Sequence, residues 1–108
     1  ESLRDEHVDK RHTLLSLRCV FDWSDEKDAE LRIARGVGFQ DIVWAIENSG
    51  LIGIYEHPNA NKYPHQLILK VLLGDYVFIV PCVRENETYF LKILYPSRRA
   101  TKDYRDEN

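Results

Sequence analysis

Five basic side chains gather toward the C-terminal end of the sequence, with a single acid among them: Lys92, Arg98, Arg99, Lys102 and Arg105. Lysine and arginine stabilise the negative charge that develops on a phosphate under attack, and arginine can contact two phosphate oxygens at once. We interpret Lys92, Arg98 and Arg99 as candidates to stabilise a scissile phosphate. A solvated basic helix, or contacts to an acidic protein partner, would explain the same residues.

Two lysines interrupt apolar runs in the second half of the chain. Lys92 shares strand parity with Phe90 and Leu94, which predicts that all three point to one face of a sheet. Lys70 interrupts the run 67–73 in the same way. Lys70 and Lys92 on neighbouring strands could line a groove. The alternative is ordinary alternation, with each lysine on the solvated face and its stem along the sheet.

Two histidines, His57 and His65, flank a loop that carries Lys62 and Tyr63. Histidine serves as a general acid or base near neutral pH, so either residue could exchange protons with a reacting phosphodiester. Lys62 and Tyr63 are candidates to hold a phosphate and a base. Because each histidine lies beside a proline or one residue from it, turn roles are equally consistent with the pattern.

Lys102 and Tyr104 lie in the closing segment and are further candidates for RNA contacts. Tyr104 can stack on a base or donate a proton, but packing of a terminal helix onto the sheet explains it as well. No metal or cofactor site is expected, because His7 and His12 lack the i, i+4 spacing of a helical metal pair and Cys19 has no nearby cysteine. Both Cys19 and Cys82 are expected to be small buried hydrophobes.

Hydrophobic periodicity and turn residues predict an α+β fold. It is a small antiparallel β-sheet with a helix hairpin packed on one face and a short C-terminal helix, forming a single domain over 1–108 with its core in 14–104. The expected elements are a frayed tail or short helix in 1–13, a strand in 14–21, helices in 25–35 and 40–47, strands in 51–55, 66–73, 76–83 and 88–95, turns at 74–75 and 84–87, a loop at 57–64, and a helix in 97–104 capped by Ser97.

Local signals within the two helices predict their ends and their buried faces. Ser24 or Asp25 is expected to cap the first helix, with Asp28 at roughly the offset of a capping box, and Gly36 to end it. The apolar stripes are expected to contain Leu31 with Ala29, Ile33 and Ala34 in the first helix, and Ile42, Val43, Trp44 and Ile46 in the second. Trp23 and Trp44 are both expected in the core.

Composition narrows the class of protein. The chain has 108 residues and a net charge of −3, so a general coat of positive charge for polyanions is excluded. No apolar run approaches the roughly 20 residues of a membrane helix. The acidic, polar N-terminus is the opposite of a secretory signal, so we expect a cytoplasmic protein with no membrane partner.

Three segments together resemble one family. Residues 21–27 (FDWSDEK), 35–42 (RGVGFQDI) and 95–104 (YPSRRATKDY) look like the F-x-W-D-x-x-K, K-H-G-V-S-F-E-E-A and I-S-A-R-R-A-T-x-x-E-x-x-Y segments of the BrnT toxins, in the same order and at about the same separations. The chain differs at Ala34-Arg35, where the family has Lys-His, and at Asp103, where the family has a late Glu.

The resemblance implies a RelE-like ribonuclease fold and the toxin of a bacterial toxin–antitoxin pair. It implies cleavage of RNA without a metal, which inhibits translation, and a hetero-oligomer with a DNA-binding antitoxin. The missing Lys-His pair and the acidic net charge favour an alternative, a catalytically inactive binding module of the same fold. A nucleic-acid-binding regulator is a further alternative, against which the net charge argues.

Overall fold

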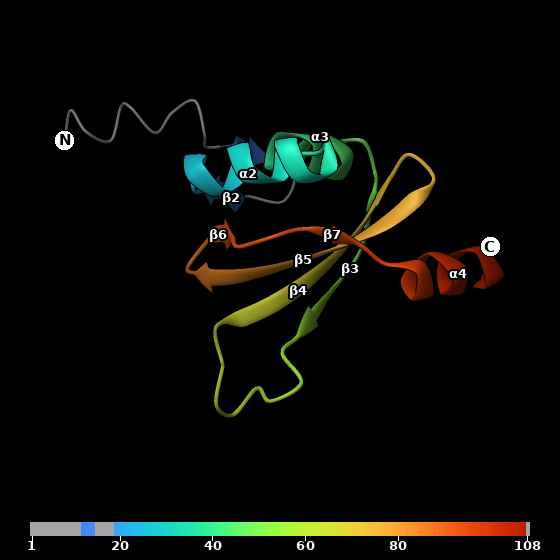
Figure 1. Cartoon of the computed structure of the whole chain (residues 1–108). Helices are drawn as coiled ribbons and strands as arrows, with labels where there is room; N and C mark the ends of the chain where they lie inside the picture. The colour runs from blue at the N-terminus through green and yellow to red at the C-terminus, as the bar shows by residue number, and fades with distance from the viewer. Residues whose placement is uncertain (1–11, 15–18, 108) are drawn as a thin grey trace.

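The computed structural model describes residues 12–14 and 19–107. The predicted tail lies outside the described residues up to position 11, as do residues 15–18 of the predicted opening strand. The chain is α+β, as predicted. Helices α2 and α3 lie over one face of a single sheet, and helix α4 lies at one end of that sheet (Figure 1). Residues 12 and 13, predicted as part of the tail, belong to a strand.

Within the described part of the chain, seven strands form the sheet, in the order β1-β2-β6-β5-β4-β3, with β7 paired to β5. Strands β3 to β6 are antiparallel to their neighbours, as predicted for the sheet, but β2 runs parallel to β6, so the sheet is mixed rather than wholly antiparallel. The chain reaches this arrangement because it leaves β2 through two helices and returns by hairpins at the far edge. The strands are β1 (His12–Leu14), β2 (Cys19–Trp23), β3 (Leu51–Glu56), β4 (Gln66–Leu73), β5 (Tyr76–Glu85), β6 (Thr88–Leu91) and β7 (Tyr95–Pro96).

Helix α2 (Asp25–Arg35) begins and ends as predicted. The Ser24 Oγ accepts a hydrogen bond from the Lys27 N–H at 3.2 Å, and Gly36 ends the helix in the left-handed conformation with φ of 73°. Glycine adopts this conformation without the steric penalty that a Cβ would bring. Helix α3 (Phe39–Glu47) begins one residue earlier than predicted.

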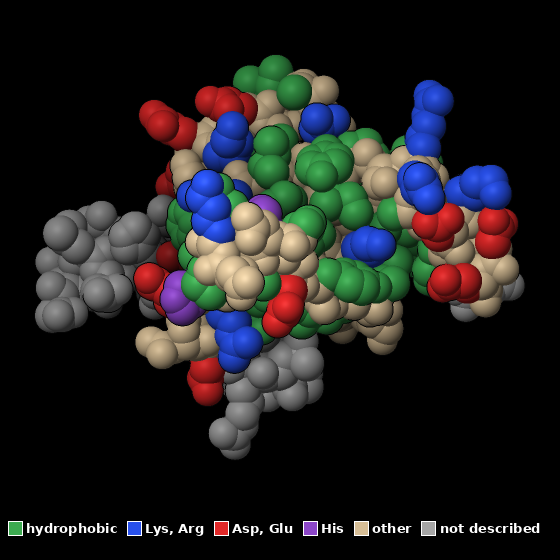
Figure 2. Space-filling view, turned by 90° about the horizontal axis from the view of Figure 1, so that it is seen from below, with side chains coloured by type: hydrophobic (Ala, Val, Ile, Leu, Met, Phe, Trp, Pro, Cys, Tyr) green, Lys and Arg blue, Asp and Glu red, His purple; other side chains and the backbone are tan. Residues whose placement is uncertain are grey.

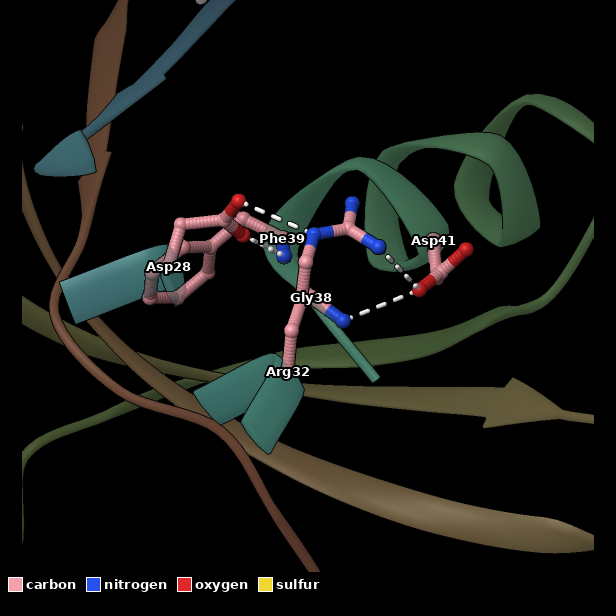
Figure 3. A network of polar contacts seen from close by, with 5 residues as sticks. All are labelled: Asp28, Arg32, Gly38, Phe39 and Asp41. Atoms are coloured by element: carbon pink, nitrogen blue, oxygen red, sulfur yellow. Dashed lines mark hydrogen bonds and ion pairs between the residues drawn. The ribbon is translucent and has the colours of Figure 1, made fainter. Parts of the chain in front are cut away.

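A polar network explains that earlier start (Figure 3). Asp28 caps α3 instead of completing a box with Ser24, since its Oδ1 accepts from the Phe39 N–H at 2.8 Å. Its Oδ2 accepts from Arg32 Nε at 3.1 Å, and Arg32 Nη1 lies 3.8 Å from Asp41 Oδ2. Asp41 also accepts from the Gly38 N–H at 2.9 Å. The network therefore joins the first helix to the start of the second.

The core lies between α2, α3 and the covered face of the sheet. Trp23 is buried as predicted, and its ring contacts that of Phe39 at a centroid distance of 5.8 Å. Trp44 is 56% exposed, so its predicted burial is wrong: the helical period gives the buried stripe to Phe39, Ile42, Val43 and Ile46. The predicted stripe of α2 is wrong as well, because Ile33 is 89% exposed and Ala29 and Ala34 are also exposed, leaving Leu31 as the buried side chain.

The predicted last strand is interrupted, which separates two residues that were predicted to share a face. Strand β6 ends at Leu91 and β7 begins at Tyr95. Within the interruption Leu94 is fully buried, whereas Lys92 is exposed. The predicted common parity of Lys92 and Leu94 is therefore wrong, because alternation holds only while the strand continues.

Helix α4 (Arg98–Glu107) packs against β5 on the face that α2 and α3 leave open. Ser97 caps it as predicted, since its Oγ accepts from the Ala100 N–H at 3.0 Å. The buried Thr101 hydroxyl donates to the Ser97 carbonyl at 2.6 Å and accepts from the Val77 N–H at 2.9 Å. These bonds fix the start of α4 on the sheet.

Candidate nucleic-acid interface

The side chains opposite the helix layer form what we call the open face of the sheet. Residues directly opposite each other in antiparallel strands share a face. Lys70 is paired with Ile79, and Tyr55 with Ile68, which is paired in turn with Pro81. Figure 2 looks onto this face: hydrophobic side chains cover much of its middle, and Lys and Arg side chains lie among and around them.

Both lysines predicted to line a groove lie on this open face. The Lys92 N–H donates to the Pro81 carbonyl at 2.9 Å, which places Lys92 beside β5, and Lys70 lies on its other side in β4. They are separated by two strand spacings across the sheet, roughly 10 Å, and by two residues along β5, roughly 7 Å. The Lys70 Nζ is 4.7 Å from the ring centroid of Tyr55, and the Lys92 Nζ is 5.2 Å from that of Phe90. Each cation thus has an aromatic ring beside it, and cations and aromatic rings are the two kinds of group that bind single-stranded nucleic acids.

The arginines of α4 lie at the end of the sheet where β5 begins. Arg98 lines a hollow of about 370 Å³ together with Tyr76, Lys102 and Arg105. The Lys102 Nζ also pairs with Asp106 at 2.9 Å. Arg99 is exposed in the first turn of the helix. This basic side of α4 offers several cations to an anion.

Lys92 and Arg98 do not meet at one point. Lys92 lies at the level of Pro81, and Ser97 at the level of Val77, to whose carbonyl its N–H donates at 2.9 Å. Four residues of strand span roughly 13 Å. The geometry therefore suits contacts to different phosphates of one strand better than contacts to a single phosphate.

The opposite side of α4 is acidic and aromatic. Asp103, Tyr104 and Glu107 line a hollow of about 120 Å³ with Lys70 and Tyr55. Tyr104 is half-buried against the sheet, the position that packing of the terminal helix predicts. The carboxylates beside Lys70 reduce its attraction for a phosphate there relative to Lys92.

The loop between β3 and β4 is held by its own residues. The Nδ1 atom of His57 accepts from the Asn59 N–H at 2.9 Å, and its ring lies 4.6 Å from that of Tyr63. The Lys62 Nζ is 5.5 Å from the Tyr63 centroid. His57 thus has the turn role, while exposed Lys62 remains accessible to a ligand.

The structure separates His65 from the lysines and places it in a different hollow. This hollow, of about 300 Å³, is lined by Glu56, Pro64, His65, Leu67, Arg84 and Asn86. Sequence reasoning missed Glu56 and Arg84, because it ended β3 at Tyr55 and placed Arg84 in a turn. Strand β5 in fact continues to Glu85, and only Asn86 and Glu87 form the turn.

Cys82 is buried in the core, as expected, with 2% of its surface exposed. Burial raises the pKa of its thiol from 9.0 to about 12, so it is not a nucleophile near neutral pH. Among the described residues no three His, Cys, Asp or Glu side chains come together as metal ligands. His7 lies outside the described residues, and His12 is in β1.

No protein-family model matches the chain, and neither a curated protein nor a solved structure matches it significantly. Within the described part of the chain, no helix is both long and apolar enough to cross a membrane.

Proposed function

We propose that this chain is the toxin of a bacterial toxin–antitoxin pair, a metal-independent endoribonuclease that binds RNA on the open face of its sheet. The observation that carries the proposal is the pairing of Lys70 with Tyr55 and of Lys92 with Phe90 on that face. Ammonium groups attract phosphates and aromatic rings stack on unpaired bases, so the pairs fit single-stranded RNA. The resemblance of three sequence segments to BrnT toxins supports the same function.

Arg98 and Arg99 add cations at the end of the sheet where β5 begins. Both are exposed in the first turn of α4, next to the basic side chains of Lys102 and Arg105 in the same helix. A strand of RNA that crosses from Lys92 to α4 follows β5 and meets cations at both ends. Binding should therefore depend on salt, since each neutralised phosphate releases counterions.

The test is induced expression in a bacterial host together with cleavage of RNA by the purified protein in the presence of a chelator. We expect growth arrest and cleavage by the wild type and loss of both in the Lys92→Ala/Arg98→Ala/Arg99→Ala variant. A matched control is Lys27→Ala/Arg35→Ala, which removes two cations from α2 on the other side of the molecule. Arrest by all three proteins would move the site away from Lys92 and α4.

A second candidate function is a non-catalytic module that binds a DNA-binding antitoxin or regulator. The exposed Ile33 and Trp44 favour it, since α2 and α3 each present a large apolar side chain to solvent. If soluble wild-type protein neither arrests growth nor cleaves RNA but binds the product of a neighbouring gene, this second function replaces the first.

A further inference from the structure

The hollow lined by Glu56, His65 and Arg84 is built by three adjacent strand ends. The Arg84 N–H donates to the His65 carbonyl at 2.8 Å, which places the two residues opposite each other. Glu56 is paired with Leu67, two residues from His65, and is its diagonal neighbour. Opposite side chains begin about 5 Å apart and diagonal ones about 7–8 Å apart, so all three reach a common point.

The side chains of Glu56, His65 and Arg84 make few hydrogen bonds or ion pairs within the fold. Among the described residues, Glu56 and His65 have no hydrogen bond or ion pair through their side chains, in contrast to His57, whose Nδ1 holds the loop. Arg84 is held in place, with its Nε donating to the Asn86 carbonyl at 3.1 Å and its guanidinium 5.7 Å from the Tyr89 ring centroid. Its two terminal nitrogens remain for a ligand in the hollow.

We propose that Glu56, His65 and Arg84 form the acid–base centre that cleaves single-stranded RNA, an inference that rests on the proposed ribonuclease function. Glu56 takes the proton of a 2′-hydroxyl, and the 2′-oxygen attacks the adjacent phosphorus. The P–O5′ bond breaks as protonated His65 gives its proton to the leaving 5′-oxygen, and Arg84 contacts the non-bridging oxygens. The products are a 2′,3′-cyclic phosphate and a 5′-hydroxyl, and no other reactant is needed.

The position of the centre provides a path for the substrate. Glu56 and His65 stand at the two ends of the loop that carries Lys62 and Tyr63. His57, at the start of this loop, is paired with Gln66 and therefore lies next to the open face. Glu56, His65 and Arg84 share strand parity with Leu67 and Cys82, so they point away from the open face. A strand of RNA therefore reaches the centre by turning around this end of β4, past the loop that carries exposed Lys62.

The experiment measures cleavage of a labelled single-stranded RNA with chelator present. We expect Glu56→Gln and His65→Ala each to slow cleavage about 10²- to 10⁴-fold, the usual contribution of one acid–base group. Arg84→Ala should slow it as well and Arg84→Lys less, while all variants retain RNA binding on the open face. The matched control is Glu85→Gln, which removes a neighbouring exposed carboxylate that does not line the hollow.

Two further readouts separate chemistry from structure. The wild-type product should end in a 2′,3′-cyclic phosphate, and an RNA with a 2′-deoxy group at the cleaved nucleotide should bind but stay intact. Thermal unfolding checks each variant, and His65→Gln replaces His65→Ala if the latter does not fold.

The outcomes distinguish the two proposals. Cleavage at the wild-type rate by folded Glu56→Gln and His65→Ala would overturn the acid–base centre and leave the ribonuclease function standing. Failure of the wild type itself to cleave any single-stranded RNA would overturn the ribonuclease function, and the centre with it.

Discussion

The two faces of one sheet are put to different uses, and β5 shows the difference within a few residues. Phe78, Val80 and Cys82 point to the helix layer and are 7%, 0% and 2% exposed. Their neighbours Ile79 and Pro81 point to the open face and are only partly buried. The same strand therefore supplies apolar surface to the core and a half-exposed floor to the candidate interface.

Charged side chains also differ between the two faces, in whether they have partners within the protein. Around the helix layer, Asp28 accepts hydrogen bonds from Arg32 Nε and from the Phe39 N–H at the start of α3 (Figure 3). On the open face, Lys70 and Lys92 lie over aromatic rings, and among the described residues neither is in an ion pair shorter than 4.0 Å. Asp28 is used in the fold because it caps a backbone N–H of the turn, whereas the two lysines have no acid partner within the described ranges and are available to a ligand. Perturbing the covered face should change stability, and perturbing the open face should change binding.

The largest expected effect is a loss of stability at high pH caused by Cys82 on the covered face. Because burial raises the folded pKa to about 12 from 9.0, the unfolded thiol ionises above pH 9 while the folded thiol stays neutral. The unfolded state then binds fewer protons, and the free energy of unfolding falls by about 1.4 kcal/mol per pH unit up to pH 12. Chemical denaturation should show that wild type loses about 2 kcal/mol more than Cys82→Ala between pH 8 and 10.5.

Lysines and tyrosines titrate in the same range, which is why the comparison is with Cys82→Ala and not with neutral pH alone. Parallel pH profiles for the two proteins would mean that Cys82 is reached by solvent and that the covered face is not sealed.

The next effect comes from the turn that holds the two helices on the covered face. A Cβ on Gly38 would lie 2.5 Å from Asp28 Oδ1 and 2.6 Å from Arg32 Nε, so Gly38→Ala must displace the bonds that these side chains make. We expect it to lower the free energy of unfolding by about 0.5–2 kcal/mol, the usual cost of losing a helix cap, measured by denaturant titration. RNA affinity of the folded variant should match wild type. Gln40→Ala, two residues on in α3, is the control, and equal stability of Gly38→Ala and the control would show that the network is dispensable.

Local sequence signals predicted the elements correctly where interactions between residues close in the sequence determine them. Ser24, Gly36 and Ser97 act on backbone groups within four residues, and each has the predicted role. The hairpin turn at 74–75 and the limits of β4 were also predicted, because alternation and turn residues agree there.

The wrong predictions concern features that depend on packing or pairing between segments far apart in the sequence. Trp44 and Ile33 are apolar, but which side of a helix faces the sheet depends on packing that composition does not show. The parallel pairing of β2 with β6 joins residues far apart in sequence. For the same reason Glu56, His65 and Arg84 were not grouped: they come together only through the register of three strands.

The smallest effect on stability, and the sharpest test of the open face, is expected from Lys70→Gln/Lys92→Gln. Surface substitutions of this kind change the free energy of unfolding by no more than about 0.5 kcal/mol. The logarithm of RNA affinity should nevertheless fall less steeply with the logarithm of salt concentration, with a slope smaller by about 1.4, since each lysine accounts for about 0.7 on a single strand. Fluorescence anisotropy of a labelled RNA over a salt series measures the slope. The control Lys27→Ala/Arg35→Ala, which also removes two cations, should keep the wild-type slope. If both double variants lose the same slope, RNA is attracted by overall charge, and the difference between the faces lies in packing alone.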